Sequence, residues 1–436
     1  MRLKKVSFGR LANGMLYYSQ FDTSSHLGGV GFKCGSAYDP PGKRGLAHHV
    51  EHNVFGESAK HSRRDLELNY YEKYMGGPDE DANIRTDYVS TFYGHDNLLW
   101  RPHLMDCFGA IADLVLHPQI GEPGVLLEKA AVHNEYYLNG IDSAFERARD
   151  RLKLVLYDRN PVRNRVDCEL PEFESVTAKD VRAFMRRYYV PNNAFMILLG
   201  PSFADVKKTA EKYFGNWAPA KSVPTLDYDH SDDFPQLIGV KSLEEVMPGI
   251  HQRHLCMGFP TETFKTKDAE ALDILARIWA FRLRVRLRHE NCDFRKGVYR
   301  VFVTPERTHL HGLLNVWFAT IGDADYVKEA EEIVLEEAKK LREELVLHDE
   351  FDAITKNLEW RYRDNFKSCM SNLSELIIEA ATNGDEELEG LHSYLPRLWR
   401  LNRKHILDVA NKYLTPNYAR VLIRPETEPS SVPAGK

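Results

Sequence analysis

The chain has 436 residues, which is enough for two domains of about 200 residues each. Hydrophobic residues make up 43% of the sequence, so both domains can bury a substantial core. The formal net charge of −6 argues against nucleic acid as the main partner, because phosphate binding usually leaves a strongly basic domain. No apolar run approaches the roughly 20 residues of a membrane-spanning helix. The six cysteines form no Cys-x-x-Cys pair, which favours isolated thiols in a reducing compartment.

Strand and helix patterns alternate along the first part of the chain. Residues 13–20 predict a turn and a strand, residues 27–39 a strand that runs into a loop, and residues 44–58 a helix. The alternation at residues 86–95 predicts another strand. Helical apolar spacing predicts two further helices, at residues 98–117 and 123–141. This first part of the chain therefore combines helices and strands.

Residues 218–240 have a different composition. Prolines, aspartates and serines replace the periodic pattern there, which predicts a linker between two halves. We place the linker at residues 223–240, between a first half at residues 1–222 and a second half at residues 241–436.

The two halves end alike. Residues 176–200 contain an amphipathic helix that ends in tyrosine, then a Pro-Asn turn after Tyr189, and then an apolar strand. Residues 394–425 repeat this order, with the turn after Tyr413. Because the repetition lies at matching positions, it predicts a duplicated α/β unit.

Residues 45–58, GLAHHVEHNVFGES, place three histidines and a glutamate within five positions. On the predicted helix, His48 and His52 lie on one face, about 6 Å apart along the axis, so both imidazoles can reach one ion. Zinc suits nitrogen ligands, and His-x-x-Glu-His is the inverzincin pattern. Glu51 lies beside the pair, where it can accept a proton from water bound to zinc. His49 points elsewhere on the helix, and we interpret it as a surface residue.

A catalytic zinc site of this kind needs a third protein ligand. The predicted helix at residues 123–141 offers Glu128 and Glu135, which lie about two turns apart on one face, near one another at the surface. From the spacing alone, either glutamate can bind zinc while the other orients a histidine.

Together these motifs resemble the pitrilysin/insulinase family of zinc peptidases, which includes the mitochondrial processing peptidases. The resemblance extends over nearly the whole chain. The paired-glutamate helix of that family, Glu-x6-Glu, corresponds to Glu128 and Glu135. The resemblance implies that Glu135 is the third zinc ligand and Glu128 its supporting acid. It also implies one zinc ion per chain, since no His-x-x-Glu-His occurs in the second half.

The resemblance implies substrate contacts as well. Asn83 and Thr86 match the substrate-binding strand of the family, to which an extended peptide adds by main-chain hydrogen bonds. In the second half, the arginine and tyrosine that reach the substrate correspond to Arg288 and Tyr299, which would stabilise the developing oxyanion. Their separation is longer than in the family, so Arg295 is an alternative to Arg288.

Residues 281–290, FRLRVRLRHE, alternate arginines with apolar residues. By itself this pattern is typical of a strand with a basic face. The resemblance places a helix end and a loop there, and at this net charge a solvated basic face, or one lining a chamber for acidic peptides, is favoured over nucleic-acid binding.

The predicted fold class is α+β, with two tandem homologous halves, each a mixed and mostly antiparallel sheet packed with helices. The predicted function is a zinc-dependent endopeptidase that hydrolyses unfolded peptides or small polypeptides inside a chamber formed by paired subunits. The alternatives are a dedicated processing protease subunit that acts on one precursor within a heterodimer, and a non-catalytic partner subunit. The resemblance implies a homodimer, or a heterodimer with a homologous subunit. We expect a cytoplasmic protein with no nucleic-acid or membrane partner.

Overall fold

The structure of the protein, a computed structural model, describes residues 5–21, 27–66, 68, 82–95, 104–135, 144–166, 170–200, 205–289, 297–366 and 370–426. The chain packs as two compact units, each assembled from three separate segments. Unit 1 consists of Met1–Tyr136, Asn164–Asp227 and Trp360–Ser393, and unit 2 consists of Tyr137–Arg163, Tyr228–Glu359 and Tyr394–Lys436. The units interleave along the sequence, so the residue boundaries given above for the two halves stay a prediction.

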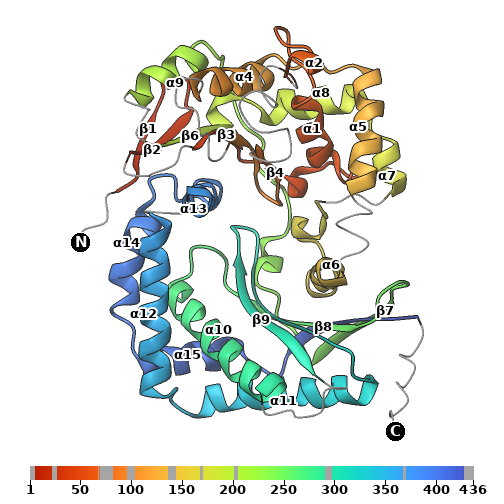
Figure 1. The fold of residues 1–436 in the computed structure, drawn as a ribbon, viewed down its shortest axis with the longest axis vertical. Helices are drawn as coiled ribbons and strands as arrows, with labels where there is room; N and C mark the ends of the chain where they lie inside the picture. Colours follow the sequence, from red (N-terminus) through yellow and green to blue (C-terminus); the bar gives the residue numbers. More distant parts are fainter. Residues whose placement is uncertain are drawn as a thin grey trace. The chain divides into compact units, whose positions relative to one another are not determined.

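A six-stranded sheet forms the centre of unit 1, with the strand order β1-β2-β6-β3-β5-β4 (Figure 1). Its strands are β1 (Ser7–Arg10), β2 (Leu16–Gln20), β3 (Leu27–Phe32), β4 (Ala82–Thr86), β5 (Thr91–His95) and β6 (Ala194–Leu199). Only the pair β2–β6 is parallel, and the other neighbours are antiparallel. The sheet is therefore mixed and mostly antiparallel, as predicted.

Unit 2 is built around a five-stranded sheet with the order β7-β11-β8-β10-β9. Its strands are β7 (Val240–Val246), β8 (Arg253–Thr261), β9 (Val298–Arg307), β10 (Gly312–Thr320) and β11 (Tyr418–Arg424). Here the parallel pair is β7–β11, and the other pairs are antiparallel.

The two sheets repeat one topology. The order β2-β6-β3-β5-β4 in unit 1 has the same connections and directions as β7-β11-β8-β10-β9 in unit 2. In each repeat the last strand follows a helix with a capping box, formed by Thr177 in one case and Asn402 in the other. The side chains of these residues accept backbone hydrogen bonds that the first turn of a helix otherwise leaves unpaired. The predicted duplication and the predicted α+β class are confirmed.

Helices cover both faces of the first sheet (Figure 1). The helices in the described part of unit 1 are α1 (Leu46–Val54), α2 (Arg63–Leu66), α4 (Leu104–Leu116), α5 (Glu122–Glu135), α7 (Leu170–Glu174), α8 (Ala178–Tyr188), α9 (Val206–Phe214) and α13 (Met370–Thr382). Among them, α1, α4, α9 and α13 contact the strands directly. Val50 of α1, Ile111 of α4 and Phe184 of α8 join the strand residues Val30 and Met196 in one buried apolar cluster. This cluster fixes α1 against the sheet.

The helices of unit 2 are α6 (Ala144–Leu156), α10 (Ala269–Arg284), α11 (Ala324–Glu343) and α15 (Arg403–Tyr413). Two more helices, α12 (His348–Asn365) and α14 (Glu389–Leu398), have residues in both units. The fully buried Trp279 of α10 packs edge-on against Phe259 of β8, with ring centroids 5.5 Å apart. None of the described helices is both long enough and apolar enough to cross a membrane.

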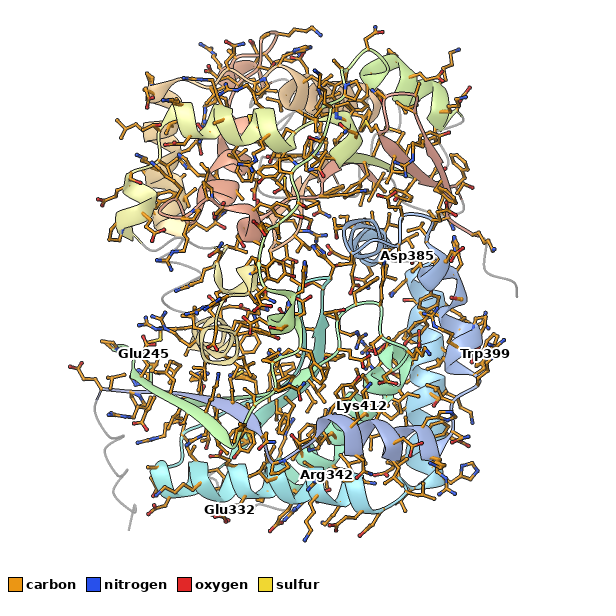
Figure 2. All side chains as sticks on the ribbon, turned by 180° about the vertical axis from the view of Figure 1, so that it is seen from behind. Glu245, Glu332, Arg342, Asp385, Trp399 and Lys412 are labelled. Carbon is orange, nitrogen blue, oxygen red and sulfur yellow. The ribbon has the colours of Figure 1, made fainter. Side chains whose placement is uncertain are left out.

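The two repeats exchange one helix each. In the sequence α6 belongs to the first half, but it packs against β7, β8 and β11 of the second sheet, whereas α13 comes from the second half and packs against β3 and β6 of the first sheet. Ion pairs hold both exchanged segments. Glu245 of β7, labelled in Figure 2, accepts hydrogen bonds from Nε of Arg147 at 2.7 Å and Nε of Arg151 at 2.8 Å. Glu386, which follows α13, pairs with Lys33 at the end of β3.

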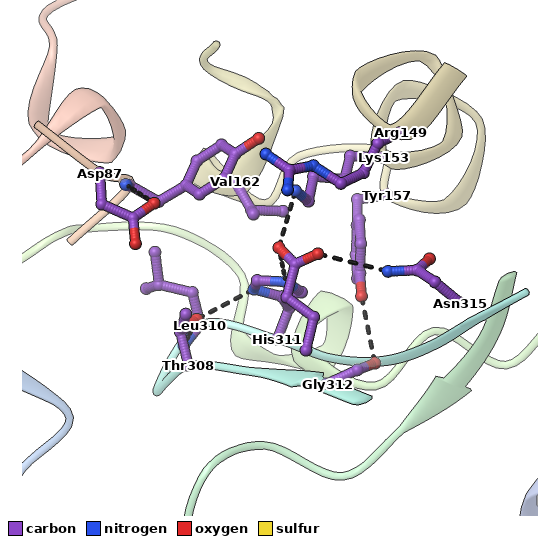
Figure 3. A network of polar contacts seen from close by, with 12 residues as sticks. Asp87, Arg149, Lys153, Tyr157, Val162, Thr308, Leu310, His311, Gly312 and Asn315 are labelled. Atoms are coloured by element: carbon purple, nitrogen blue, oxygen red, sulfur yellow. Dashed lines mark hydrogen bonds and ion pairs between the residues drawn. The ribbon is translucent and has the colours of Figure 1, made fainter. Parts of the chain in front are cut away.

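A buried polar network lies between α6 and the β9–β10 hairpin of unit 2 (Figure 3). Oε1 of Glu306 lies 2.7 Å from Nζ of Lys153 and 3.2 Å from Nε2 of His311. Asn315 donates to the other carboxylate oxygen at 3.3 Å. Burial raises the pKa of the Glu306 carboxyl, but the charge of Lys153 and the hydrogen bond from His311 outweigh it and hold that pKa well below its usual value. The exchanged helix α6 is thus joined to β9 of the second sheet by an ion pair between the buried Lys153 and Glu306.

The arginine-rich stretch ends α10 and continues as a π-helix, η8 (Val285–His289). The expected helix end is therefore present. However, Arg282 lies 2.7 Å from Glu350, and Arg286 lies 2.8 Å from Glu336, so these two arginines do not form a free basic face. The prediction of a solvated basic face is wrong for them, because acidic residues of α11 and α12 neutralise them.

Candidate metal centre

Helix α1 has two stripes of different character. Val50 and Val54 are one turn apart and face the core, whereas His48, Glu51 and His52 follow the spacing of a second face. The helix follows Gly45, whose φ of 84° is a left-handed conformation that favours glycine.

A carboxylate fixes the start of this helix. One oxygen of Asp39 accepts a hydrogen bond from the backbone N–H of Gly45, and the other accepts one from Ala47, both at 2.7 Å. Asp39 is buried, and these contacts satisfy N–H groups that the first turn of a helix leaves unpaired. Asp39 therefore fixes the first turn of α1, and with it the position of the histidines that follow on this helix.

Three side chains converge on one point. Nε2 of His48 and Nε2 of His52 are 3.3 Å apart, and Oε2 of Glu135 lies 3.6 Å from the first and 3.2 Å from the second. A tetrahedral zinc ion with ligands at about 2.0–2.1 Å keeps neighbouring ligand atoms about 3.3–3.4 Å apart. The separations therefore fit three corners of a zinc tetrahedron. Within the described residues, this is the one group of histidine, cysteine and acidic side chains with such geometry.

The electrostatics of this group also fit a cation. Burial lowers the pKa of His52, but hydrogen bonds to Glu128 and Glu135 outweigh burial and raise it to about 10. Hydrogen bonds to His48 and His52 hold the pKa of the Glu135 carboxyl well below its usual value. The carboxylates thus attract positive charge onto the group. Two imidazole nitrogens and one carboxylate oxygen are a donor set that zinc prefers.

Glu128 lies two turns before Glu135 on α5, and its side chain is buried. Its Oε2 lies 3.3 Å from Nδ1 of His52, the ring nitrogen that faces away from the group. Its other oxygen pairs with Arg63 of α2. Glu51 lies on the same face of α1 as His48 and His52, is buried, and contributes to the raised pKa of His52. The structure therefore brings together the five residues predicted around the ion.

Two sequence interpretations are wrong. His49 is not a surface residue: it is fully buried, its ring packs edge-on against Phe173 with centroids 5.0 Å apart, and burial lowers its pKa to about 3. Glu128 is also buried rather than exposed. In both cases the reason is a neighbouring helix that the local pattern does not reveal. Phe173 of α7 contacts His49, and α5, which carries Glu128, packs against α1.

The predicted substrate residues Asn83 and Thr86 lie on β4, the outer strand of the first sheet in the described part of the chain. Helix α1 packs against this strand, so the strand edge and the histidine helix are neighbours within unit 1. Arg288 is exposed on the π-helix η8. The backbone of Tyr299 belongs to β9, while its side chain and the whole of Arg295 lie outside the described residues.

Comparisons with known proteins agree with this geometry. Residues 15–168 match the family described as Insulinase (Peptidase family M16), and residues 175–358 match the Peptidase M16 inactive domain. Two similar relatives are the zinc protease PqqE of Helicobacter pylori, 22% identical over 88% of this chain and 83% of that protein, and the uncharacterized zinc protease YmxG of Bacillus subtilis, 22% identical over 91% and 92%. A crystal structure of a protease from Helicobacter pylori superposes with a TM-score of 0.84 at 21% identity and covers 97% of this chain and 100% of that chain. This last likeness shows the fold.

Proposed function

The chain belongs to the M16 (insulinase) family of peptidases, and residues 15–168, which match the Insulinase description, contain the donor set of a zinc protease. From this we propose that the chain is a zinc-dependent endopeptidase. The observation that carries this proposal is the convergence of His48, His52 and Glu135 at tetrahedral separations. These residues hold the ion. When bound, zinc supplies a Lewis acid that polarises a peptide carbonyl and lowers the pKa of a water molecule.

The remaining roles belong to side chains of the chain itself. Glu51 takes the proton of the attacking water and returns it to the leaving amine, which is general acid–base catalysis by one carboxylate. The outer edge of β4, with Asn83 and Thr86, aligns an extended peptide by main-chain hydrogen bonds. Support for this step comes from the position of β4 at the sheet edge and from its contact with α1. Arg288 and Tyr299 are the predicted partners of the substrate carbonyl.

Unfolded peptides and small polypeptides are the proposed substrates, because strand addition requires an extended chain. The proposed assembly is a dimer, either of two identical chains or with a homologous subunit, that encloses the substrate in a chamber. This assembly is supported by the resemblance to a family in which four such repeats enclose a chamber. The cytoplasmic location stays a prediction.

The test uses the full-length chain. We expect one zinc ion per chain by elemental analysis, cleavage of an unstructured fluorogenic peptide, and no cleavage of a stably folded protein of similar size. His48→Ala and His52→Ala should lose both zinc and activity. A chain that binds no zinc would contradict the proposed site, and a zinc-loaded chain that cleaves no peptide, alone or with a homologous subunit, would instead favour a non-catalytic partner role.

Mass measurement after size-exclusion chromatography tests the assembly. A self-paired enzyme gives twice the mass of one chain and cleaves peptides by itself. If the purified chain is monomeric and gains activity only with a homologous subunit, the heterodimer is correct. Cleavage restricted to one precursor would identify a dedicated processing protease.

A further inference from the structure

The ligand His52 is connected to the surface of unit 1 through two consecutive polar contacts. Its Nδ1 lies 3.3 Å from Oε2 of Glu128, and the guanidinium of Arg63 pairs with Oε1 of the same carboxylate. The Glu128 side chain is 8% exposed, whereas that of Arg63 is 40% exposed. Arg63 therefore reaches from the surface to a buried carboxylate, and the two oxygens of this carboxylate have separate partners.

The short helix α2, which carries Arg63, is anchored by the segments around it. Its helix α2 follows a turn built on Ser58, whose hydroxyl donates to Asp113 at 2.5 Å and accepts the N–H of His61 at 3.0 Å. Leu66, on the same short helix, is buried in the core cluster. A Cβ atom added to Gly56, just after α1, would come within 3.2 Å of Nη2 of Arg63. Glycine at this position thus leaves room for the guanidinium beside the end of the metal helix.

The geometry gives each oxygen of Glu128 one task. A carboxylate buried with a single partner can turn about its last bond and so move its accepting oxygen away from His52. With Arg63 on Oε1, the carboxylate is held at both oxygens, and Oε2 points at Nδ1 of His52. In the tautomer that donates to Oε2, the hydrogen of the His52 imidazole is on Nδ1, and the lone pair of Nε2 faces His48 and Glu135. A histidine that binds a metal ion through Nε2 needs the lone pair in this direction.

We propose that Arg63 is a positioning residue for the zinc ligand His52 and that it acts through Glu128. The proposal rests on the proposed function, because it assumes that zinc is held by His48, His52 and Glu135. It adds a residue that the spacing of the metal motif does not reveal. Arg64, the next residue on the same helix, is exposed, and the structure gives it no contact with Glu128.

Zinc affinity, measured by competition with a chromophoric chelator on the full-length protein, tests this role. Groups that orient metal-bound histidines typically contribute about 10–100-fold in metal affinity, so we expect Arg63→Met to weaken zinc binding by about 10-fold. The matched control Arg64→Met removes the same charge one residue away and should change the affinity less than twofold. Arg63→Lys, which keeps the charge but not the planar fork, should give an intermediate loss.

Two further measurements separate positioning from folding. In a Glu128→Gln background, Arg63→Met should cause no additional loss of zinc affinity, because the carboxylate through which it acts is already absent. The visible absorption of the Co²⁺-substituted protein should change in Arg63→Met and not in Arg64→Met, since it reports ligand geometry. The melting temperature of the metal-free protein shows whether either variant has lost its fold.

The outcomes distinguish this inference from the proposed function. If the wild-type chain binds zinc and Arg63→Met and Arg64→Met bind it with the wild-type affinity, Arg63 has no positioning role and the inference is wrong. The proposed zinc site is not contradicted by that result. The same conclusion follows if Arg63→Met weakens zinc binding equally with and without Glu128. If the wild-type chain binds no zinc, the proposed function itself fails.

Discussion

Helices α1 and α10 occupy equivalent places in the two repeats, yet they bury different kinds of side chain. Helix α1 follows β3 and precedes β4 and β5, and helix α10 follows β8 and precedes β9 and β10. Both β3 and β8 pair antiparallel with the strand that comes last in the sequence of their sheet, β6 and β11 respectively. Helix α1 buries three ionisable groups, His48, His49 and Glu51, in nine residues. Helix α10 buries mainly apolar side chains over 16 residues, and its buried Glu270 is paired with Arg397.

The difference shows how a duplicated unit can divide two tasks. Burying imidazoles and carboxylates destabilises a fold unless they find partners or a metal ion, whereas each fully buried apolar side chain stabilises it by about 1.5–3 kcal/mol. Helix α1 carries chemistry on the face away from the core, and α10 contributes hydrophobic packing at the same topological place. The comparison can be tested by changing each helix and measuring both chemistry and stability.

The largest effect is expected from Glu51→Gln in α1. The amide cannot take a proton from water, so peptide hydrolysis should fall by about 10²–10⁴-fold, the usual contribution of a general base. Zinc content and melting temperature should stay close to those of the wild type. Peptide cleavage and elemental analysis of the same sample check this, and substantial remaining turnover would show that Glu51 is not the base.

The converse change is Leu275→Ala in α10. Leu275 is fully buried, so the variant should lose about 2–5 kcal/mol of unfolding free energy through lost burial and a cavity. Zinc affinity and activity per folded molecule should not change. Denaturant unfolding and chelator competition measure the two quantities. If zinc affinity fell with the stability, the division of tasks between α1 and α10 would not hold.

The two regions should also respond oppositely to pH in the metal-free protein. In unit 1 the pKa of His52 is raised from 6.5 to about 10. The contribution of protonated His52 to folding stability is therefore fully present below about pH 6.5 and is lost as the pH rises toward 10. In unit 2 the pKa of Glu306 is held well below its ordinary value of 4.5. The contribution of the Glu306 carboxylate to folding stability is therefore fully present above about pH 4.5 and is lost as the pH falls below it. In thermal unfolding measured from about pH 2 to pH 10, the His52→Ala variant should lack the alkaline dependence and the Glu306→Gln variant the acidic dependence. Unchanged profiles would mean that other groups dominate.

The smallest effect is expected from Glu245→Gln, which weakens the ion pairs that hold α6 on the second sheet. The Glu245 side chain is 20% exposed and has two arginine partners, so we expect a loss of about 1 kcal/mol in unfolding free energy. Zinc affinity should not change, because the metal group lies in unit 1. A calorimetric comparison with the wild type checks the stability, and a loss of zinc would link the two regions.

Much of the metal centre could be predicted from local spacing. His48, Glu51 and His52 lie within one helical segment, and helix geometry alone places them on one face. Spacing left Glu128 and Glu135 as equal candidates, and only the packing of α5 on α1 shows which carboxylate faces Nε2 of His52.

Other features depend on contacts between distant segments. Arg63 and Glu128 are 65 positions apart, and no pattern in either segment indicates that they pair. His49 was misplaced because helical spacing identifies faces but not what packs on each of them. The repeat at Tyr189 and Tyr413 correctly predicted duplication, but an amphipathic pattern does not specify which sheet a helix covers, so the exchange of α6 and α13 was not foreseen.

The exchange of α6 and α13 has a consequence for synthesis on the ribosome. When residues 1–222 have emerged, β3 and β6 still lack α13, which is completed only at Thr382. Strands β3 and β6 of the sheet that carries the metal helix therefore lack this helix until most of the chain has been translated, and peptidase activity should mature late. A fragment of residues 1–222 should resist proteolysis only when the remainder of the chain is supplied in trans.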